Sequence, residues 1–185
     1  INFLKKKKIN PDIVVNNVGG NLGYTDPLAP ISDYEKVFHL NFNLTVEINR
    51  QVIPNMVKKK WGRIINISSI SALENQGPPS YCAAKAALNA YTRSLGRFIS
   101  KDNVIMTTVM PGAIMTKGGY WDLKSKNDKK HVAKYLQDRM AIKRFGNVSE
   151  ISGFVVFLAS DHASFCPGSG FLVDGGQGRL FYNGE

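Results

Sequence analysis

Residues 63–85, RIINISSISALENQGPPSYCAAK, decide the fold. A β-branched run predicts a buried strand over residues 63–68, and the loop that follows contains Gly77-Pro78-Pro79. The alanine-rich stretch from about residue 80 to residue 100 predicts a helix that packs closely against a sheet or another helix. A strand, a loop and a helix in this order are the repeating unit of a parallel α/β sheet.

The same alternation continues on both sides of this stretch. Further strands are predicted at residues 12–16, 103–110 and 170–174, and further helices at 32–60, with an interruption, and from 149 onward. Ser32, with Glu35 three residues later, predicts a capping box at the start of the first of these helices. The pattern predicts a single domain over residues 1–185, a Rossmann-like doubly wound parallel sheet in three αβα layers. The lysine-rich stretch from about 115 to 145 is predicted to form a lid or substrate segment.

Composition excludes several classes of protein. The 185 residues are 43% hydrophobic and 21% charged, as in globular proteins rather than disordered or fibrous ones. No apolar run approaches the roughly 20 residues that span a bilayer, so no membrane partner is predicted. The two cysteines, Cys82 and Cys166, suit reduced thiols in the cytoplasm, and neither they nor the three histidines have the spacing of a metal site.

The net charge of +10 raises the question of nucleic-acid binding. The lysines stand in short runs at or near predicted helix ends, at residues 5–8, 58–60 and 124–134, where cations complement the helix dipole. Aromatic residues are not interleaved with these runs as base stacking requires. We therefore expect no nucleic-acid partner, whereas an anionic substrate or cofactor is compatible with the excess charge.

Polar or glycine-rich residues follow each predicted strand, at the rim where parallel sheets bind ligands. They are Asn16-Asn17-Val18-Gly19, Ser68-Ser69, Pro111-Gly112 with Thr116, and Asp174-Gly175-Gly176. Turn chemistry alone also explains the last of these groups. The four strand ends are predicted to converge on one ligand site.

Tyr81 and Lys85 lie four residues apart, and thus on one face of the predicted helix. An ammonium group near a phenol lowers the pKa of the phenol, which allows a tyrosine to exchange a proton with an alcohol or carbonyl oxygen. Ser69, at the end of the neighbouring strand, can hydrogen-bond the same oxygen. Ser68 competes with it, because adjacent strand residues face opposite ways. Taken alone, the Tyr/Lys pair is better explained as an ordinary exposed helix pair.

Taken together, the motifs resemble the short-chain dehydrogenase/reductase family, classical type, over about residues 11 to 178. The resemblance implies that Tyr81 is the general acid/base, that Lys85 lowers its pKa and holds the ribose of a nicotinamide cofactor, NAD or NADP, and that Ser69 orients the reacting oxygen. Asn41, within the predicted helix, is implied to hold a water linking Lys85 to solvent. The implied cofactor-binding residues are Asn16, Asn17, Val18, Gly19, Tyr81, Lys85, Pro111, Gly112, Ile114 and Thr116.

The sequence departs from the family pattern at two places. The glycine-rich turn that binds the cofactor pyrophosphate, and the residue that distinguishes NAD from NADP, have no counterpart before residue 11. We therefore expect these 185 residues to be the later part of a longer chain that lacks its N-terminal nucleotide-binding half, with the strand at 12–16 left as an apolar edge. The interval from Ser69 to Tyr81 is one residue shorter than is common in the family.

The predicted reaction interconverts an alcohol and a carbonyl group of a small molecule. The residues 74–77 and 118–122 are faintly similar to oxidoreductases of flagellin or surface-sugar modification, which favours a sugar-type substrate. Trp121 and Tyr120 either stack on the substrate or pack within the lid. Two helices, at 32–60 and 80–100, resemble those through which the family forms homodimers and homotetramers. The alternative is a non-catalytic binding or regulatory protein that has lost nucleotide binding.

Overall fold

The computed structural model describes residues 6, 7 and 9–179, so the segment at residues 1–5 and 8 lies outside the described residues. Its main sheet contains four parallel strands in the order β1-β2-β3-β6: β1 (Ile13–Asn16), β2 (Gly62–Ile67), β3 (Val104–Pro111) and β6 (Gly170–Val173). A two-stranded sheet of β4 (Ile114–Met115) and β5 (Gly146–Asn147) lies beyond it. This topology confirms the predicted α/β parallel sheet with flanking helices.

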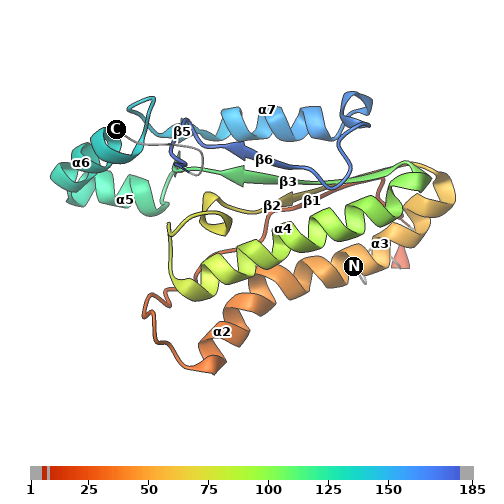
Figure 1. The fold of residues 1–185 in the computed structure, drawn as a ribbon, viewed down its shortest axis with the longest axis horizontal. Helices are drawn as coiled ribbons and strands as arrows, with labels where there is room; N and C mark the ends of the chain where they lie inside the picture. The colour runs from red at the N-terminus through yellow and green to blue at the C-terminus, as the bar shows by residue number, and fades with distance from the viewer. Residues whose placement is uncertain (1–5, 8, 180–185) are drawn as a thin grey trace.

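Helices cover both faces of the sheet (Figure 1). One face carries α2 (Ile31–Phe38), the π-helix η1 (His39–Asn43), α3 (Leu44–Lys59) and α4 (Pro79–Ile99), and the other carries α7 (Val148–Leu158). Two further helices, α5 (Tyr120–Asn127) and α6 (Lys129–Arg139), lie at one end of the sheet, beyond the last residues of β3. The α5–α6 segment, residues 117–144, is called the lid below. None of the helices among the described residues is both long and apolar enough to cross a membrane.

Two apolar cores hold the layers together. Met56 of α3, Ile64 of β2 and Met106 of β3 are fully buried on the α3–α4 side. On the α7 side, Ile65 and Val109 pack against Leu158. Neighbouring residues of β2 thus enter opposite cores, as the alternation of a strand requires.

The predicted close packing of the alanine-rich helix is found near its C-terminal end. A Cβ atom at Gly96 would lie 2.8 Å from the backbone N of Gly168 and 3.1 Å from the carbonyl O of Met106. Only a residue without a side chain permits this approach. The helix is thereby held close to the sheet, which fixes Tyr81 and Lys85 at its other end.

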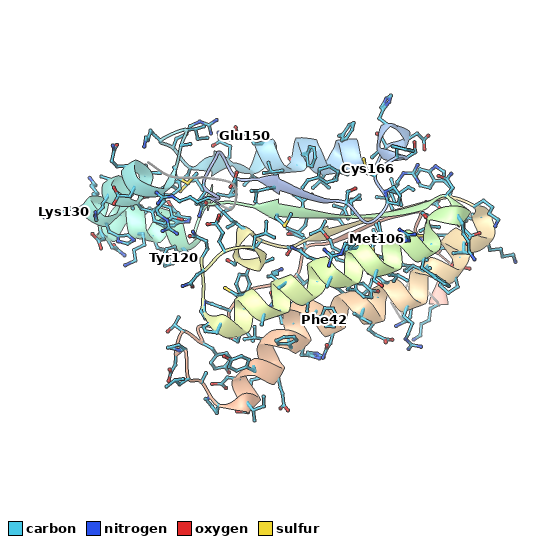
Figure 2. All side chains as sticks on the ribbon, in the orientation of Figure 1. Phe42, Met106, Tyr120, Lys130, Glu150 and Cys166 are labelled. Atoms are coloured by element: carbon cyan, nitrogen blue, oxygen red, sulfur yellow. The ribbon has the colours of Figure 1, made fainter. Side chains whose placement is uncertain are left out.

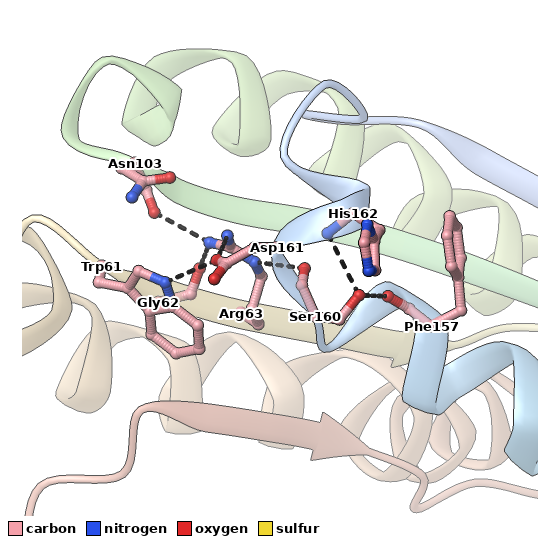
Figure 3. Close-up of polar contacts among 8 residues, drawn as sticks. All are labelled: Trp61, Gly62, Arg63, Asn103, Phe157, Ser160, Asp161 and His162. Carbon is pink, nitrogen blue, oxygen red and sulfur yellow. Dashed lines mark hydrogen bonds and ion pairs between the residues drawn. The ribbon is translucent and has the colours of Figure 1, made fainter.

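Arg63 anchors the end of the sheet where β2 begins (Figure 3). Its side chain is 1% exposed, and its guanidinium group donates to the carbonyl oxygens of Ser160, Gly62 and Asn103 and to the Asp161 carboxylate, at 2.8–3.2 Å. These bonds join β2 to the segments that follow α4 and α7. Trp61 covers the guanidinium, 4.6 Å from it.

The structure differs from the sequence prediction at two helix starts. The predicted capping box of Ser32 and Glu35 is wrong, because α2 begins at Ile31 after Pro30 and has no side-chain cap. A capping box does form at α7, where the side chains of Asn147 and Glu150 bond each other's backbone N–H groups. Proline pre-sets the backbone angle for helix entry, and this replaces the expected side-chain bond at α2.

β1 forms one edge of the main sheet in the described part of the chain. Its register pairs Ile13 with Arg63 and Asn16 with Asn66 of β2. Ile13 and Val15 are 47% and 45% exposed. The strand therefore has the apolar edge that was expected from the sequence.

Candidate active site

The candidate site is built where α4 begins beside the end of β2. Lys85 is 3% exposed, and its ammonium Nζ donates to the carbonyl O of Ile67 at 2.9 Å and lies 5.7 Å from the centroid of the Tyr81 ring. The helical spacing thus brings both side chains to the rim, as predicted. An ammonium group has three N–H donors, so Lys85 retains donor capacity beyond the Ile67 bond.

Burial shifts the pKa values of both groups. It lowers the pKa of Lys85 from 10.5 to about 8. Burial also raises the pKa of the Tyr81 phenol, while a hydrogen bond with the Ser69 side chain acts in the opposite direction. The net pKa of Tyr81 in the protein alone is therefore raised and not lowered as predicted, because desolvation of the phenolate outweighs the hydrogen bond with Ser69.

The two serines after β2 face different partners. Ser68 is 5% exposed and donates from Oγ to the backbone O of Lys85 at 3.2 Å, which ties the strand to α4. Ser69 has extended backbone angles and caps the short helix η2 (Ile70–Ala72), its Oγ accepting from the Ser71 N–H at 3.1 Å. Since only Ser69 contacts the Tyr81 phenol, the geometry favours Ser69 over Ser68 as its partner at the rim.

Asn41 lies fully buried in the π-helix η1. Its Nδ2 donates to the carbonyl oxygens of Gly20 and Val37, both at 2.8 Å, and its Oδ1 accepts from the Gly20 N–H at 2.9 Å. A π-bulge is common at functional sites, where it re-aims a side chain out of the helical ladder. Here it aims Asn41 at the loop after β1.

Gly19 lies between Asn41 and Lys85. A Cβ at this position would stand 2.7 Å from Asn41 Oδ1 and 2.8 Å from Lys85 Nζ. No side chain fits between these groups without moving one of them. The neighbours Asn17 and Val18 are exposed, so the loop after β1 is open to a ligand on its outer side.

Asn16 is placed differently from the rest of the predicted site. It is 6% exposed, and its Nδ2 donates to Oδ1 of Asn49 at 2.9 Å and of Asn66 at 2.8 Å. Asn66 in turn donates to Thr92 Oγ1 at 2.8 Å. The Asn16 side chain thus belongs to a buried polar network that joins β1, β2, α3 and α4, and not to the open rim.

The segment after β3 closes the other side of the rim. Gly112 packs so tightly that a Cβ would lie 2.7 Å from the Cα of Asp174, and its N–H donates to Val173 O at 3.1 Å. Ile114 belongs to β4, which pairs with β5, and Thr116 is exposed at the start of the lid. The predicted residues 111–116 therefore lie between the sheet and the lid.

The aromatic residues of the lid pack on one another. Trp121 lies 4.2 Å from the Tyr135 ring and 4.7 Å from the Phe145 ring, centroid to centroid, and Tyr120 meets it edge-on at 4.9 Å. Of the two readings of Trp121, the structure therefore shows lid packing. Tyr120 is 61% exposed and lies at the start of α5, nearer the sheet than Lys130 (Figure 2).

Sequence reasoning missed Gln177, which is 2% exposed. Its Oε1 accepts from the Ala113 N–H and its Nε2 donates to the Tyr135 hydroxyl, both at 2.7 Å. The only signal was its position directly after Asp174-Gly175-Gly176, a group that turn chemistry already explained. The turn itself forms, with Gly175 and Gly176 in left-handed conformations.

Comparisons with known proteins identify related sequences and structures. A family model described as enoyl-(acyl carrier protein) reductase matches residues 1–177. The chain is 35% identical over 180 residues to the 3-oxoacyl-[acyl-carrier-protein] reductase FabG of Rickettsia typhi, covering 95% of this chain and 71% of that protein. The FabG of Aquifex aeolicus is 32% identical, with 90% and 65% covered. A crystal structure of the Agrobacterium tumefaciens C58 3-oxoacyl-(acyl-carrier-protein) reductase with NADP bound is 28% identical, with a TM-score of 0.86 and 95% and 68% covered. The chain thus spans about two thirds of the length of these relatives.

Proposed function

The chain belongs to the short-chain dehydrogenase/reductase family of oxidoreductases, and we propose from this that it interconverts a carbonyl group and an alcohol with Tyr81 as the proton donor and acceptor. The observation that carries the proposal is the convergence of Tyr81, Ser69 and the buried ammonium of Lys85 at the end of β2. A phenol, a hydroxyl and a cation at one point are what a polarised carbonyl oxygen requires.

In the reducing direction, Ser69 donates a hydrogen bond to the substrate oxygen and Tyr81 transfers its phenolic proton to that oxygen. The Lys85 ammonium, near the Tyr81 ring, stabilises the phenolate that remains. Asn41, which holds the Gly20 backbone, keeps the loop after β1 against Lys85 and is proposed to hold the water through which the proton is replaced. The oxidising direction reverses each proton transfer.

The residues present fit the nicotinamide end of a dinucleotide, NAD or NADP. Lys85 has N–H donors beyond its bond to Ile67, and the hydroxyl groups of a ribose can accept hydrogen bonds from them. Asn17 and Val18, together with residues 111–116 on the opposite side, would hold the cofactor against this point. When bound, the cofactor supplies or accepts the hydride.

The charge of the lid supports a substrate presented by an acidic carrier. Residues 117–144 contain nine Lys or Arg and three Asp or Glu, a net charge of +6 out of the chain's +10. Lys129 and Lys130 are exposed without an acidic partner among the described residues, and Lys130 lies at the outer end of the lid (Figure 2). We therefore favour 3-oxoacyl groups on an acyl carrier protein, the substrate class in the names of the relatives, and we infer from the charge of the lid that this carrier is acidic.

A sugar-type substrate is the second candidate. It is favoured by the polar loop at residues 74–77, which lies against the site: a Cβ at Gly77 would stand 3.3 Å from Cδ1 of Tyr81. The two substrate candidates are distinguished by the rates with three kinds of substrate. These are a carrier-linked 3-oxoacyl thioester, the same thioester on a small thiol, and nucleotide-linked ketosugars. On the carrier hypothesis, only the carrier-linked substrate shows a KM that rises steeply with salt.

The catalytic proposal is tested at Tyr81 and at the two serines. Tyr81→Phe should retain the fold and lose at least about a hundredfold in kcat. Ser69→Ala should lower kcat in the same way, whereas Ser68→Ala, which removes a bond to backbone, should lower stability and leave kcat within about threefold. Equal kcat for Tyr81→Phe and the parent would contradict the relay. Absence of turnover in the parent, with no cofactor binding by calorimetry, favours the non-catalytic alternative.

The exposed face of α4 and the cysteines bear on the oligomeric state and the cellular location. The outer face of α4 exposes Ala83, Ala86, Ala90 and Phe98, so a second copy can approach closely. We propose a homo-oligomer, dimer or tetramer, which light scattering after size exclusion would establish. The two cysteines are free, as a cytoplasmic location requires.

A further inference from the structure

Gln177 joins three segments that surround the candidate site. Its Oε1 accepts from the N–H of Ala113, just after β3, at 2.7 Å. Its Nε2 donates to the hydroxyl of Tyr135 in the lid at 2.7 Å and to Oε1 of Gln76, in the loop after β2, at 3.4 Å. At 2% exposure, the side chain makes these bonds away from water, where each is costly to lose.

The turn after β6 holds Gln177 in this position. Gly175 and Gly176 have φ angles of 63° and 73°, and Asp174 Oδ1 accepts from the Gly176 N–H at 3.0 Å. On the other side, a Cβ at Gly112 would lie 2.8 Å from Gln177 Oε1. The inward direction of the side chain is therefore set by the backbone and not by its own rotamer choice.

On the lid side, the bond reaches the aromatic cluster. Tyr135, which receives the Gln177 hydrogen bond, packs against Trp121 with ring centroids 4.2 Å apart, and Trp121 packs against Phe145 with centroids 4.7 Å apart. The lone pairs of the Tyr135 hydroxyl oxygen accept the amide N–H. A change at Gln177 is thus transmitted to the packing of α5 on α6.

On the side opposite the lid, the loop at residues 74–77 lies between Gln177 and Tyr81, the proposed proton donor. Gln76 adjoins Gly77, whose missing Cβ would stand 3.3 Å from the Tyr81 ring. The Arg179 backbone N–H also donates to Glu74 in this loop. The segment 174–179 therefore bonds both the lid and the loop beside Tyr81.

We propose that Gln177 is a positioning residue that sets the lid and the loop at residues 74–77 relative to each other and so determines how substrate is bound beside Tyr81. The inference rests on the proposed function for its effect on catalysis. An amide suits this position because it accepts at Ala113 and donates to Tyr135 at the same time, which neither a carboxylate nor an apolar side chain does.

The test compares Gln177→Met with Gln137→Met, the same change at an exposed glutamine of α6. Gln177→Met should raise KM about tenfold, the equivalent of one or two net hydrogen bonds, with kcat and its pH profile unchanged. Tyr135→Phe, which removes only the lid bond, should give part of this effect, and the double variant should be less than additive. Gln137→Met should change none of these quantities.

A second readout needs no activity. The chain has two tryptophans, so Trp61→Phe leaves Trp121 as the reporter of lid packing. Acrylamide quenching of Trp121 should increase in Gln177→Met and Tyr135→Phe but not in Gln137→Met. Quenching and KM equal to those of the parent would overturn the inference. If the parent has no turnover, the proposed function fails, while the quenching result still decides whether Gln177 positions the lid. If Gln177→Met does not fold, Tyr135→Phe alone carries both tests.

Discussion

Replacing Lys85 with methionine should flatten the pH dependence of stability above neutral pH. Burial lowers the pKa of Lys85 from 10.5 to about 8, whereas the unfolded chain keeps the ordinary value. Between these two values the unfolded state binds more protons than the folded state, so the free energy of unfolding rises with pH. Methionine cannot titrate and removes this contribution.

The magnitude follows from the two pKa values. From about pH 7 to about pH 9.5, the linkage relation gives a gain of about 2 kcal/mol in the free energy of unfolding from Lys85 alone. For a chain of this size, the midpoint of thermal unfolding should rise by about 4 to 8 °C. The side chain is 3% exposed, so little of the effect is lost to solvent screening.

The assay is thermal unfolding by circular dichroism at several pH values for the parent, Lys85→Met and Lys58→Met, a control at an exposed lysine of α3. Subtracting the Lys85→Met curve from the parent curve cancels the tyrosines, whose ionisation acts near and above pH 10. The parent and Lys58→Met should show the rise, and Lys85→Met should not. The same slope in all three proteins would refute the burial of a lysine with a lowered pKa.

Two further predictions concern close packing and the buried arginine. Gly19→Ala should reduce turnover by more than about tenfold, because its Cβ would stand 2.8 Å from Lys85 Nζ; unchanged steady-state rates would show that this approach is not needed. Arg63→Met should lower the free energy of unfolding by about 3 kcal/mol in urea titrations, because one buried and two partly buried hydrogen bonds to carbonyl groups are lost together with the ion pair to Asp161. Asp161→Asn should cost less than about 1 kcal/mol, since the Asp161 side chain is 81% exposed; equal losses would mean that the ion pair is the anchor.

The order of strands and helices was predictable from the sequence because hydrophobic periodicity records burial directly. Ile64 and Ile65 stand next to each other, and each enters a different core, which is the pattern of a strand covered on both faces. The start of α2 was not predictable, because Ser32 and Pro30 both give helix-start signals and sequence alone does not rank them. The helices of the lid are polar, and so they lack the periodic signal that marks α4.

The candidate site was predictable only where local spacing fixes geometry. Four residues on a helix bring Tyr81 and Lys85 to one face whatever the remainder of the chain does. The interior position of the Asn16 side chain depends on Asn49 and Asn66, which are 33 and 50 residues away, so no local pattern marks it. The direction of the Tyr81 pKa shift depends on burial, which spacing does not reveal.

The buried ammonium of Lys85 connects stability to the proposed chemistry. Among the residues that the structure describes, its single acceptor is the Ile67 carbonyl, so at neutral pH these residues satisfy the charge only in part. A ligand that brings acceptors to Nζ supplies the missing bonds, and it must therefore raise the pKa of Lys85 as it binds. We therefore expect the protein to take up protons when the cofactor binds near pH 8. Calorimetry in buffers of different ionisation enthalpy measures this uptake, and Lys85→Met should abolish it. Binding without proton uptake would place the cofactor away from Lys85.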